Sequence, residues 1–272
     1  MQFNIISIFP DFIESFSQTG VVGQAIKAGL IKLQTVNPRD FASDAHKSVD
    51  DRPFGGGDGM IMLPGPLSDS LEHLEKHQQL GHVVYLSPQG QKWDDEKVRR
   101  AADQWVASNQ AVTFICGRYG GIDQRIISQY VDDEISLGDF VLSGGELAAM
   151  AVVDSVARFI PGVLGNNESP WKESFSSGLL ECPQWTRPRE FQGLNVPETL
   201  VSGDHARIEK ERQRVSLLRT WCLRPDLLAT MEAGSLNSKL SEALRWAQTI
   251  GADELSVWGF NNSQIHKILS GE

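Results

Sequence analysis

In the first 160 residues, short runs rich in β-branched and aromatic residues alternate with stretches of helical period. The first strand-like run is FNIISIF at residues 3–9, and later runs begin at residues 31, 82, 111 and 133. Strands that alternate with helices predict a mostly parallel sheet covered by helices on both faces. The sequence therefore favours an α/β fold, in which ligands bind at the carboxyl ends of the strands.

Three of these runs end in glycine-bearing sequences, namely SPQG at 87–90, CGRYGG at 116–121 and GDFVLSGG at 138–145. Glycine exposes backbone N–H groups and lets a flat ligand approach the chain closely. Ser143 precedes Glu146 by three residues, which is the spacing of a capping box, and apolar residues at helical period follow. We expect a long helix to begin there, beside the predicted ligand site.

The common nucleotide-binding fingerprints are absent from the sequence. No GxGxxG follows the first strand, and FGGGDGM at 54–60 lacks the Gly-Lys-Ser/Thr of a P-loop. A Rossmann dinucleotide enzyme is therefore disfavoured, and so is the ordinary Rossmann-type methyltransferase, which would need a glycine-rich first turn.

Length and composition bound the class of protein. A chain of 272 residues with 40% apolar content favours two domains. The start MQFNIISIFPDF lacks the basic residues of a signal peptide, and no apolar run approaches the roughly 20 residues that cross a bilayer. We therefore expect a cytoplasmic protein without membrane contact. Cys116, Cys182 and Cys222 are far apart, which disfavours a disulfide framework and a zinc site, so no metal site is expected.

Residues after about 162 differ in character from those before. The stretch 162–174 has the Gly, Asn, Ser and Pro content of a spacer, and Arg-rich helical patterns follow near 204–221 and 236–249. The net charge of −10 argues against a general nucleic-acid coat, yet residues 187–224 hold eight basic and five acidic side chains, a local charge of +3. This region is either a solvated helix face or a surface that contacts phosphates.

Five long motifs, in this order and spacing, resemble the bacterial tRNA (guanine-N1)-methyltransferase family, TrmD. They are DDRPFGGGDGM (50–60), YLSPQG (85–90), CGRYGGID (116–123), LGDFVLSGGELAAMAVVDSVARFIPGVLG (137–165) and SFSSGLLECPQWTRPREFQG (174–193). The likeness covers roughly residues 1–225. It implies a SPOUT-type α/β fold, mostly parallel, with a deep C-terminal trefoil knot and a smaller helical C-terminal domain. The implied domains are a cofactor-binding domain at 1–161, a linker at 162–174 and a tRNA-binding domain at 175–272.

The resemblance also implies an activity. The family uses S-adenosylmethionine to methylate N1 of guanine at position 37 of tRNA, binds the anticodon stem-loop, and forms a homodimer with shared active sites. By motif, the cofactor-binding residues are Tyr85, Leu86, Ser87, Pro88, Gly90, Gly117, Tyr119, Gly121, Leu137, Gly138, Asp139, Phe140, Val141, Leu142, Gly144, Gly145 and Glu181. The residues expected to contact RNA are His46, Arg52, Gly57, Gly59, Arg187 and His205.

The chemistry needs a base for the N1 proton of guanine and a cation for charge that moves towards O6. By resemblance, Glu173 takes the place of the family's general-base Asp, and Arg158 matches the family arginine. Arg158 could instead pair with Asp154 on its own helix. The chain departs from the family pattern with Glu at 173 and 181 and with Gly120 where an acid is usual.

Two alternatives to guanine-N1 methylation stay open. A SPOUT methyltransferase with another RNA target, such as a ribose 2′-hydroxyl, would not need Glu173. A knotted RNA-binding dimer could have lost catalysis through the three departures. The sequence also leaves open whether Mg²⁺ assists the reaction.

Overall fold

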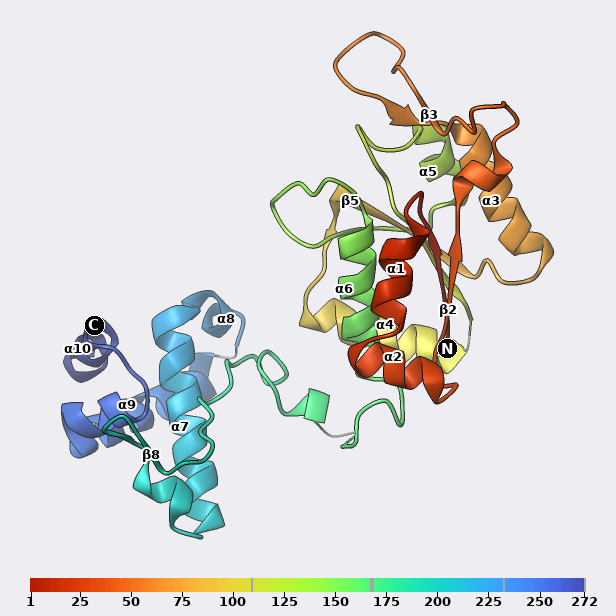
Figure 1. Cartoon of the computed structure of the whole chain (residues 1–272). Coiled ribbons are helices and arrows are strands. Elements are labelled where there is room, and N and C mark those ends of the chain that lie inside the picture. Colours follow the sequence, from red (N-terminus) through yellow and green to blue (C-terminus); the bar gives the residue numbers. More distant parts are fainter. Residues whose placement is uncertain (109, 167–168, 232, 272) are drawn as a thin grey trace. The chain divides into compact units, whose positions relative to one another are not determined.

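The structure, a computed structural model, describes residues 1–108, 110–166, 169–231 and 233–271 (Figure 1). The chain divides into two compact units, Met1–Asn167 and Glu168–Glu272. The division falls inside the stretch 162–174 that has the composition of a spacer.

The first unit is built on a five-stranded sheet in the order β2-β1-β6-β5-β7. All neighbouring strands of this sheet run parallel, which confirms the predicted α/β fold with a parallel sheet. Its strands are β1 (Gln2–Ile6), β2 (Lys32–Val36), β5 (His82–Lys92), β6 (Val112–Ile115) and β7 (Asp133–Ser136).

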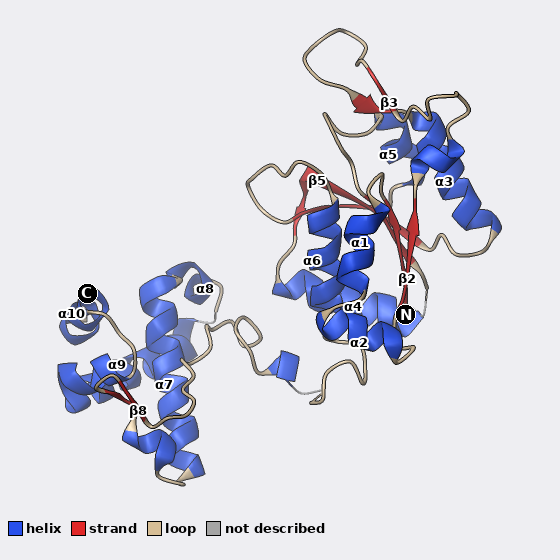
Figure 2. Ribbon diagram, viewed as in Figure 1, coloured by secondary structure: helices blue, strands red, loops and turns tan. Residues whose placement is uncertain are grey.

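Helices cover both faces of this sheet (Figure 2). Successive strand side chains point to opposite faces, so Phe114 belongs to one buried cluster and Ile115 to the other. The cluster around Phe114 is covered by α1 (Pro10–Ser17), α2 (Gly20–Lys27), α4 (Asp95–Ser108) and α6 (Glu146–Ala157). The cluster around Ile115 is covered by η1 (Pro38–Phe41), α3 (Pro64–Lys76) and α5 (Gln124–Tyr130).

A small antiparallel hairpin joins the sheet near the carboxyl ends of its strands. It pairs β3 (Asp50–Asp51) with β4 (Ile61–Met62). Met62 also forms a bridge with Ile122, in the segment that follows β6. The hairpin is thereby fixed to one of the glycine-bearing loops.

The start of α6 differs from the prediction. The long helix is present at Glu146–Ala157, but its N-cap is Gly145 and no side chain caps it, so the predicted capping box at Ser143 is wrong. The backbone N–H of Gly145 donates to the Gly117 carbonyl, and the Ser143 carbonyl accepts from Arg118. Because these contacts fix residues 143–145 against the CGRYGG loop, the Glu146 carboxylate lies in the interior, away from a capping position.

The second unit is mainly helical, and the helices predicted near 204–221 and 236–249 are present. Trp258 is fully buried among side chains of α7, α8, α9 and α10. Gly251, with φ 79° and ψ 179°, kinks α9. The elements are η2 (Ser169–Trp171), β8 (Glu190–Phe191), β9 (Leu194–Asn195), η3 (Glu198–Val201), α7 (His205–Leu223), α8 (Pro225–Ala229), α9 (Ala233–Val257) and α10 (Asn262–Ser270).

No helix in the described part of the chain combines the length and the apolar character that crossing a membrane requires.

Candidate functional site

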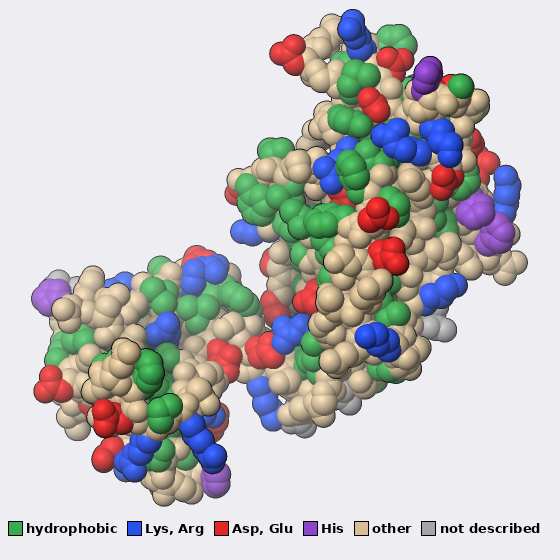
Figure 3. All heavy atoms as spheres, in the orientation of Figure 1, with side chains coloured by type: hydrophobic (Ala, Val, Ile, Leu, Met, Phe, Trp, Pro, Cys, Tyr) green, Lys and Arg blue, Asp and Glu red, His purple; other side chains and the backbone are tan. Residues whose placement is uncertain are grey.

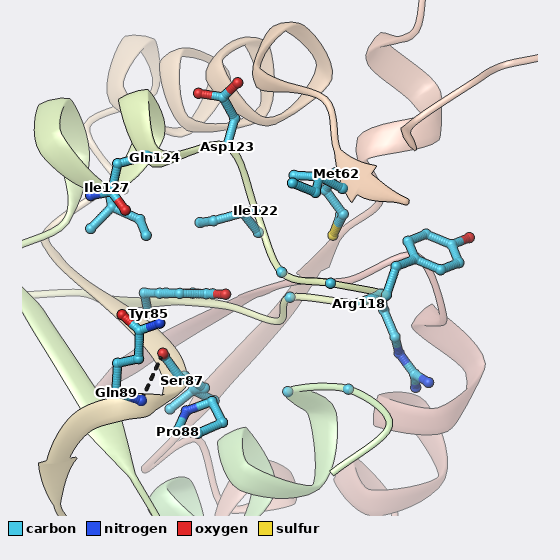
Figure 4. A pocket seen from close by; sticks show the side chains of 18 of the residues that line it. Met62, Tyr85, Ser87, Pro88, Gln89, Arg118, Ile122, Asp123, Gln124 and Ile127 are labelled. Atoms are coloured by element: carbon cyan, nitrogen blue, oxygen red, sulfur yellow. Dashed lines mark hydrogen bonds between the residues drawn. The ribbon is translucent and has the colours of Figure 1, made fainter. Parts of the chain in front are cut away.

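A cavity of about 1030 Å³ lies at the carboxyl ends of β5, β6 and β7 (Figure 4). Small-molecule sites commonly occupy about 300–1,000 Å³, so this cavity is at the upper end of that range. Its walls come from the three glycine-bearing loops and from the β3–β4 hairpin. The position is where open parallel sheets bind ligands.

The SPQG loop is a bulge in the pairing of β5 with β7. Leu86 and Gln91 both pair with Ile135, so residues 87–90 are looped out between them. Inside the loop, the Gln89 N–H donates to Ser87 Oγ at 3.1 Å (Figure 4). A Cβ added to Gly90 would lie 2.5 Å from the Ile135 backbone nitrogen. The loop therefore lies so close to β7 that only glycine fits at this position.

The CGRYGG loop packs against the Tyr85 side chain. A Cβ on Gly117 would lie 2.9 Å from Tyr85 Oη, so glycine is needed for this approach. Burial raises the pKa of Tyr85, and a hydrogen bond to the Ile122 backbone opposes that rise. Tyr119 adopts a left-handed backbone conformation with φ 59° and is 52% exposed. The loop thus buries one tyrosine and leaves the other at the cavity surface.

The third loop carries large apolar side chains that are not buried. Phe140 is 56% exposed and Val141 is 82% exposed, whereas Leu137 and Leu142 pack against the core. All four side chains line the cavity. An exposed apolar group beside a cavity is typical of a surface that meets a ligand or partner.

A buried ion pair, which the sequence analysis missed, lies beside these loops. Glu146 is fully buried, and its Oε2 lies 2.9 Å from Arg118 Nη2. Ser7 Oγ donates to Glu146 Oε1 at 2.6 Å. Burial, reinforced by the Glu146 carboxylate, raises the pKa of the Cys116 thiol well above its ordinary value. No sequence motif pointed to this pair, because Glu146 matched the pattern of a helix cap.

The cavity brings together most of the residues predicted to bind the cofactor. Gly90, Gly138, Asp139 and Glu181 are not among its lining residues, and Glu181 belongs to the second unit. The predicted residues that line it are Tyr85, Leu86, Ser87, Pro88, Gly117, Tyr119, Gly121, Leu137, Phe140, Val141, Leu142, Gly144 and Gly145.

Residues predicted to contact RNA are exposed in both units. Arg52 lines the cavity beside the β3–β4 hairpin. The others, all exposed, are His46, Gly57 and Gly59 in the first unit and Arg187 and His205 in the second.

The two predicted catalytic residues belong to different units. Arg158 directly follows α6 as its C-cap residue and is partly buried. Glu173 is also partly buried, and its backbone carbonyl accepts a hydrogen bond from Ser176 Oγ at 2.7 Å.

Among the residues that the structure describes, no group of three or more His, Cys, Asp and Glu is placed to hold a metal ion.

The fold and the cavity define an α/β protein with a glycine-lined site at the carboxyl edge of a parallel sheet. A family model described as tRNA (Guanine-1)-methyltransferase TrmD matches residues 1–230. The chain therefore belongs to the TrmD family, and the resemblance inferred from its motifs is confirmed.

Relatives named tRNA (guanine-N(1)-)-methyltransferase are similar over most of their length. One from Enterobacter sp. (strain 638) is 48% identical over 241 residues, covering 88% of this chain and 92% of the relative. One from Pectobacterium carotovorum subsp. carotovorum (strain PC1) is 49% identical, covering 85% and 90%. One from Vibrio vulnificus (strain YJ016) is also 49% identical, covering 85% and 91%.

Proposed function

We propose that this protein is an enzyme that transfers a methyl group from S-adenosylmethionine to N1 of guanine at position 37 of tRNA. The observation that carries the proposal is the cavity formed by three glycine-bearing loops, in a chain 48–49% identical to proteins named for this activity.

The cavity fits a cofactor with a flat, apolar ring and polar edges. Leu137, Phe140 and Leu142 offer apolar surface for the faces of the ring, and the glycines leave backbone N–H groups accessible for its edge. The approach of Gly117 to Tyr85 leaves no room for a larger residue in this wall. When bound, S-adenosylmethionine supplies a methyl group activated by a sulfonium.

The proposal includes the SPOUT-type trefoil knot. Its support is the path of the SPQG loop: residues 87–90 loop out of the pairing of β5 with β7, and the chain then pairs with β7 again at Gln91 and Lys92. A Cβ on Gly90 would lie 2.5 Å from the Ile135 backbone nitrogen, so this loop lies close against β7. Because knots are nearly absent from proteins, this support adds to the family membership and does not replace it.

In the proposed mechanism, Glu173 accepts the N1 proton of guanine, and the Arg158 guanidinium stabilises the charge that develops towards O6. A carboxylate is a weak base, which suits a proton that becomes acidic only as the N–CH₃ bond forms.

The length of α6 supports the proposed homodimer with shared active sites. Gly145, at the start of this helix, lines the cavity, whereas Arg158 stands 13 residues later. At 1.5 Å per residue, the two ends are about 20 Å apart. In the proposed dimer, Arg158 serves the cavity of a second copy of the chain. Leu147 on α6 and Phe12 on α1 are 48% and 43% exposed, which supports an apolar contact between copies beside α6.

The second unit is the proposed tRNA-binding domain. We keep the boundaries 1–161, 162–174 and 175–272 for the cofactor-binding domain, the linker and this domain. Lys and Arg side chains gather where α7 begins, with Asp and Glu next to them (Figure 3). Such a surface contacts phosphates of the anticodon stem-loop and positions the RNA without reading its sequence.

Assistance by Mg²⁺ is the part of the reaction that the sequence left open. Since no cluster of three or more metal-binding side chains occurs among the described residues, an ion would take most of its oxygen ligands from RNA, cofactor or water. Turnover that is unchanged by EDTA removes Mg²⁺ from the proposal.

The test is transfer of labelled methyl from S-adenosylmethionine to a tRNA transcript with guanines at positions 36 and 37, beside a transcript with adenine at 37. Label on the guanine transcript alone supports the proposal. Label on both transcripts indicates a different RNA target. No label on either, with the cofactor still bound in calorimetry, indicates an RNA-binding protein without catalysis.

A further inference from the structure

The ion pair of Arg118 and Glu146 is the strongest feature that the proposed reaction leaves unused. The Glu146 side chain is 1% exposed, and its two oxygens contact Ser7 and Arg118. A carboxylate buried in this way is stable only when it is paired and hydrogen-bonded. Glu146 therefore needs both partners, one from the segment after β1 and one from the CGRYGG loop.

Arg118 joins its own loop to two regions that are distant from it in the sequence. Its Nη1 donates to the Ser143 carbonyl at 3.2 Å, and its guanidinium carbon lies 4.4 Å from the centre of the Phe9 ring. Its backbone forms an antiparallel bridge with Gly144. One side chain thus contacts the segment after β1, the third glycine loop and the start of α6.

The Arg118 side chain is fitted between the loops. A Cβ added to Gly144 would lie 2.1 Å from Arg118 Nε, so the guanidinium occupies the space of the missing side chain. Arg118 leaves its loop on the side away from Tyr85 and Gln89 (Figure 4). The spacing between the CGRYGG and LSGG segments is therefore set by this one side chain as well as by backbone hydrogen bonds.

We propose that Arg118 is a positioning residue for methyl transfer. Anchored by Glu146 and Ser7, it holds the loops 117–121 and 137–145 at the separation that S-adenosylmethionine requires. The inference rests on the proposed function of the cavity. A positioning role differs from a purely stabilising role, because only the positioning role predicts weaker cofactor binding by a variant that is still folded.

The first variant is Arg118→Lys, which keeps a cation for Glu146 but cannot also reach the Ser143 carbonyl as the planar guanidinium does. Displacement of the loops on an ångström scale lowers kcat/KM for the cofactor roughly 10²-fold. We expect this loss to come mainly from a higher KM for S-adenosylmethionine, with the KM for tRNA unchanged.

The second variant is Ser7→Ala, which removes an anchor of Glu146 without altering a charge or a residue that lines the cavity. It should raise the KM for S-adenosylmethionine less than Arg118→Lys does. The matched control is Arg100→Lys on α4, since Arg100 pairs with Glu96 in an exposed contact. The control should leave both KM values unchanged.

The experiment measures steady-state kinetics, calorimetric binding of S-adenosylmethionine and thermal melting for each full-length variant. A raised KM and weaker binding in folded Arg118→Lys and Ser7→Ala support the inference. Wild-type affinity in both folded variants overturns it and leaves the proposed function intact. If Arg118→Lys does not fold, the affinity of folded Ser7→Ala for S-adenosylmethionine supports or overturns the inference by the same criteria. Wild-type protein that does not bind the cofactor overturns the proposed function and this inference together.

Discussion

The two units hold their proposed catalytic groups in different ways. In the first unit, the three glycine-bearing loops that line the cavity each begin or end at a strand of the parallel sheet or at α6, so these loops are fixed by the core. In the second, Glu173 lies in the stretch 169–204, whose described regular elements are two short 3₁₀ helices and a hairpin with two residues per strand.

The difference suggests that the cavity exists before its ligand arrives, whereas the proposed base lies in a segment with little regular secondary structure. The described local contacts of Glu173 include two hydrogen bonds to its backbone carbonyl, both from Ser176. A segment with so little regular secondary structure can adjust to a bound RNA at a small free-energy cost. Such adjustment would also accommodate the additional methylene of Glu at this position, compared with the Asp of the family.

The largest expected effect comes from removing the base. Glu173→Gln should lower kcat about 10²- to 10⁴-fold, because general-base catalysis contributes that much. Cofactor affinity, measured by calorimetry, should not change, since the cavity belongs to the first unit. The matched control is Glu173→Asp, which keeps the carboxylate. Substantial turnover by the Gln variant would remove Glu173 from the mechanism.

The second-largest expected effect tests whether the two units fold independently of each other. Trp258 is fully buried and packs edge-on against Trp185 and Trp246. Trp258→Ala should cost about 3–5 kcal/mol of unfolding free energy in the second unit. We expect tRNA methylation to fall and cofactor binding to persist. Leu194→Ala, at a residue 75% exposed, is the control and should change stability by less than about 0.5 kcal/mol. Loss of cofactor binding in Trp258→Ala would mean that the units fold as one.

A third substitution tests the site in the first unit. Arg158→Ala should lower kcat about 10²- to 10³-fold by removing a preorganised cation, with folding and cofactor affinity retained. Arg158→Lys should recover part of the rate. The decisive measurement mixes Arg158→Ala with Glu173→Gln. Mixed dimers regain activity if the Arg158 and Glu173 of one site come from different chains, and they stay inactive if both residues of a site come from the same chain.

The smallest expected effect is a difference in thiol reactivity between the cores of the two units. Cys116 is fully buried, burial raises the pKa of Cys182 to about 12, and burial also raises that of the half-buried Cys222. Because the thiolate is the nucleophile, Ellman's reagent at pH 8 should modify Cys222 first, then Cys182, and Cys116 last. Cys116 reacting first would show that the first unit opens more readily than the second.

The raised pKa of Cys182 also predicts the direction in which stability changes with pH. The raised pKa of Cys182 means that the folded state favours the neutral thiol. Its contribution to stability is fully present below the unfolded pKa of about 8.5 and is lost as the pH rises towards 12. Denaturant midpoints of Cys182→Ala and wild type should therefore converge at alkaline pH.

Much of the first unit could be predicted because buried parallel strands are continuous apolar runs. Helix α3 was not predicted from the sequence, although Leu67, Leu71 and Leu74 recur at helical spacing and are all buried. The pairs β3–β4 and β8–β9 have two residues per strand, which is too short for an alternating pattern to be recognised.

The candidate site was predictable where glycine loops follow strands, and not where contacts are distant in the sequence. Glu146 has the spacing of a helix cap, and its actual partner Ser7 is 139 residues away. Local patterns carry no information about such a pair. The C-terminal helix α10 lies beyond residues 1–230, which the family model matches, so no motif was available there.

The contact between Ser7 and Glu146 has a consequence for protein synthesis. The end of the first strand is among the earliest parts of the chain to leave the ribosome, yet its partner is made 139 residues later. At a synthesis rate of about 5–20 residues per second, Glu146 is added to the chain roughly 7–30 seconds after Ser7. During that interval the nascent chain has strands but no complete cavity. A chain truncated before residue 146 should therefore bind no cofactor, and a chaperone has time to act on it.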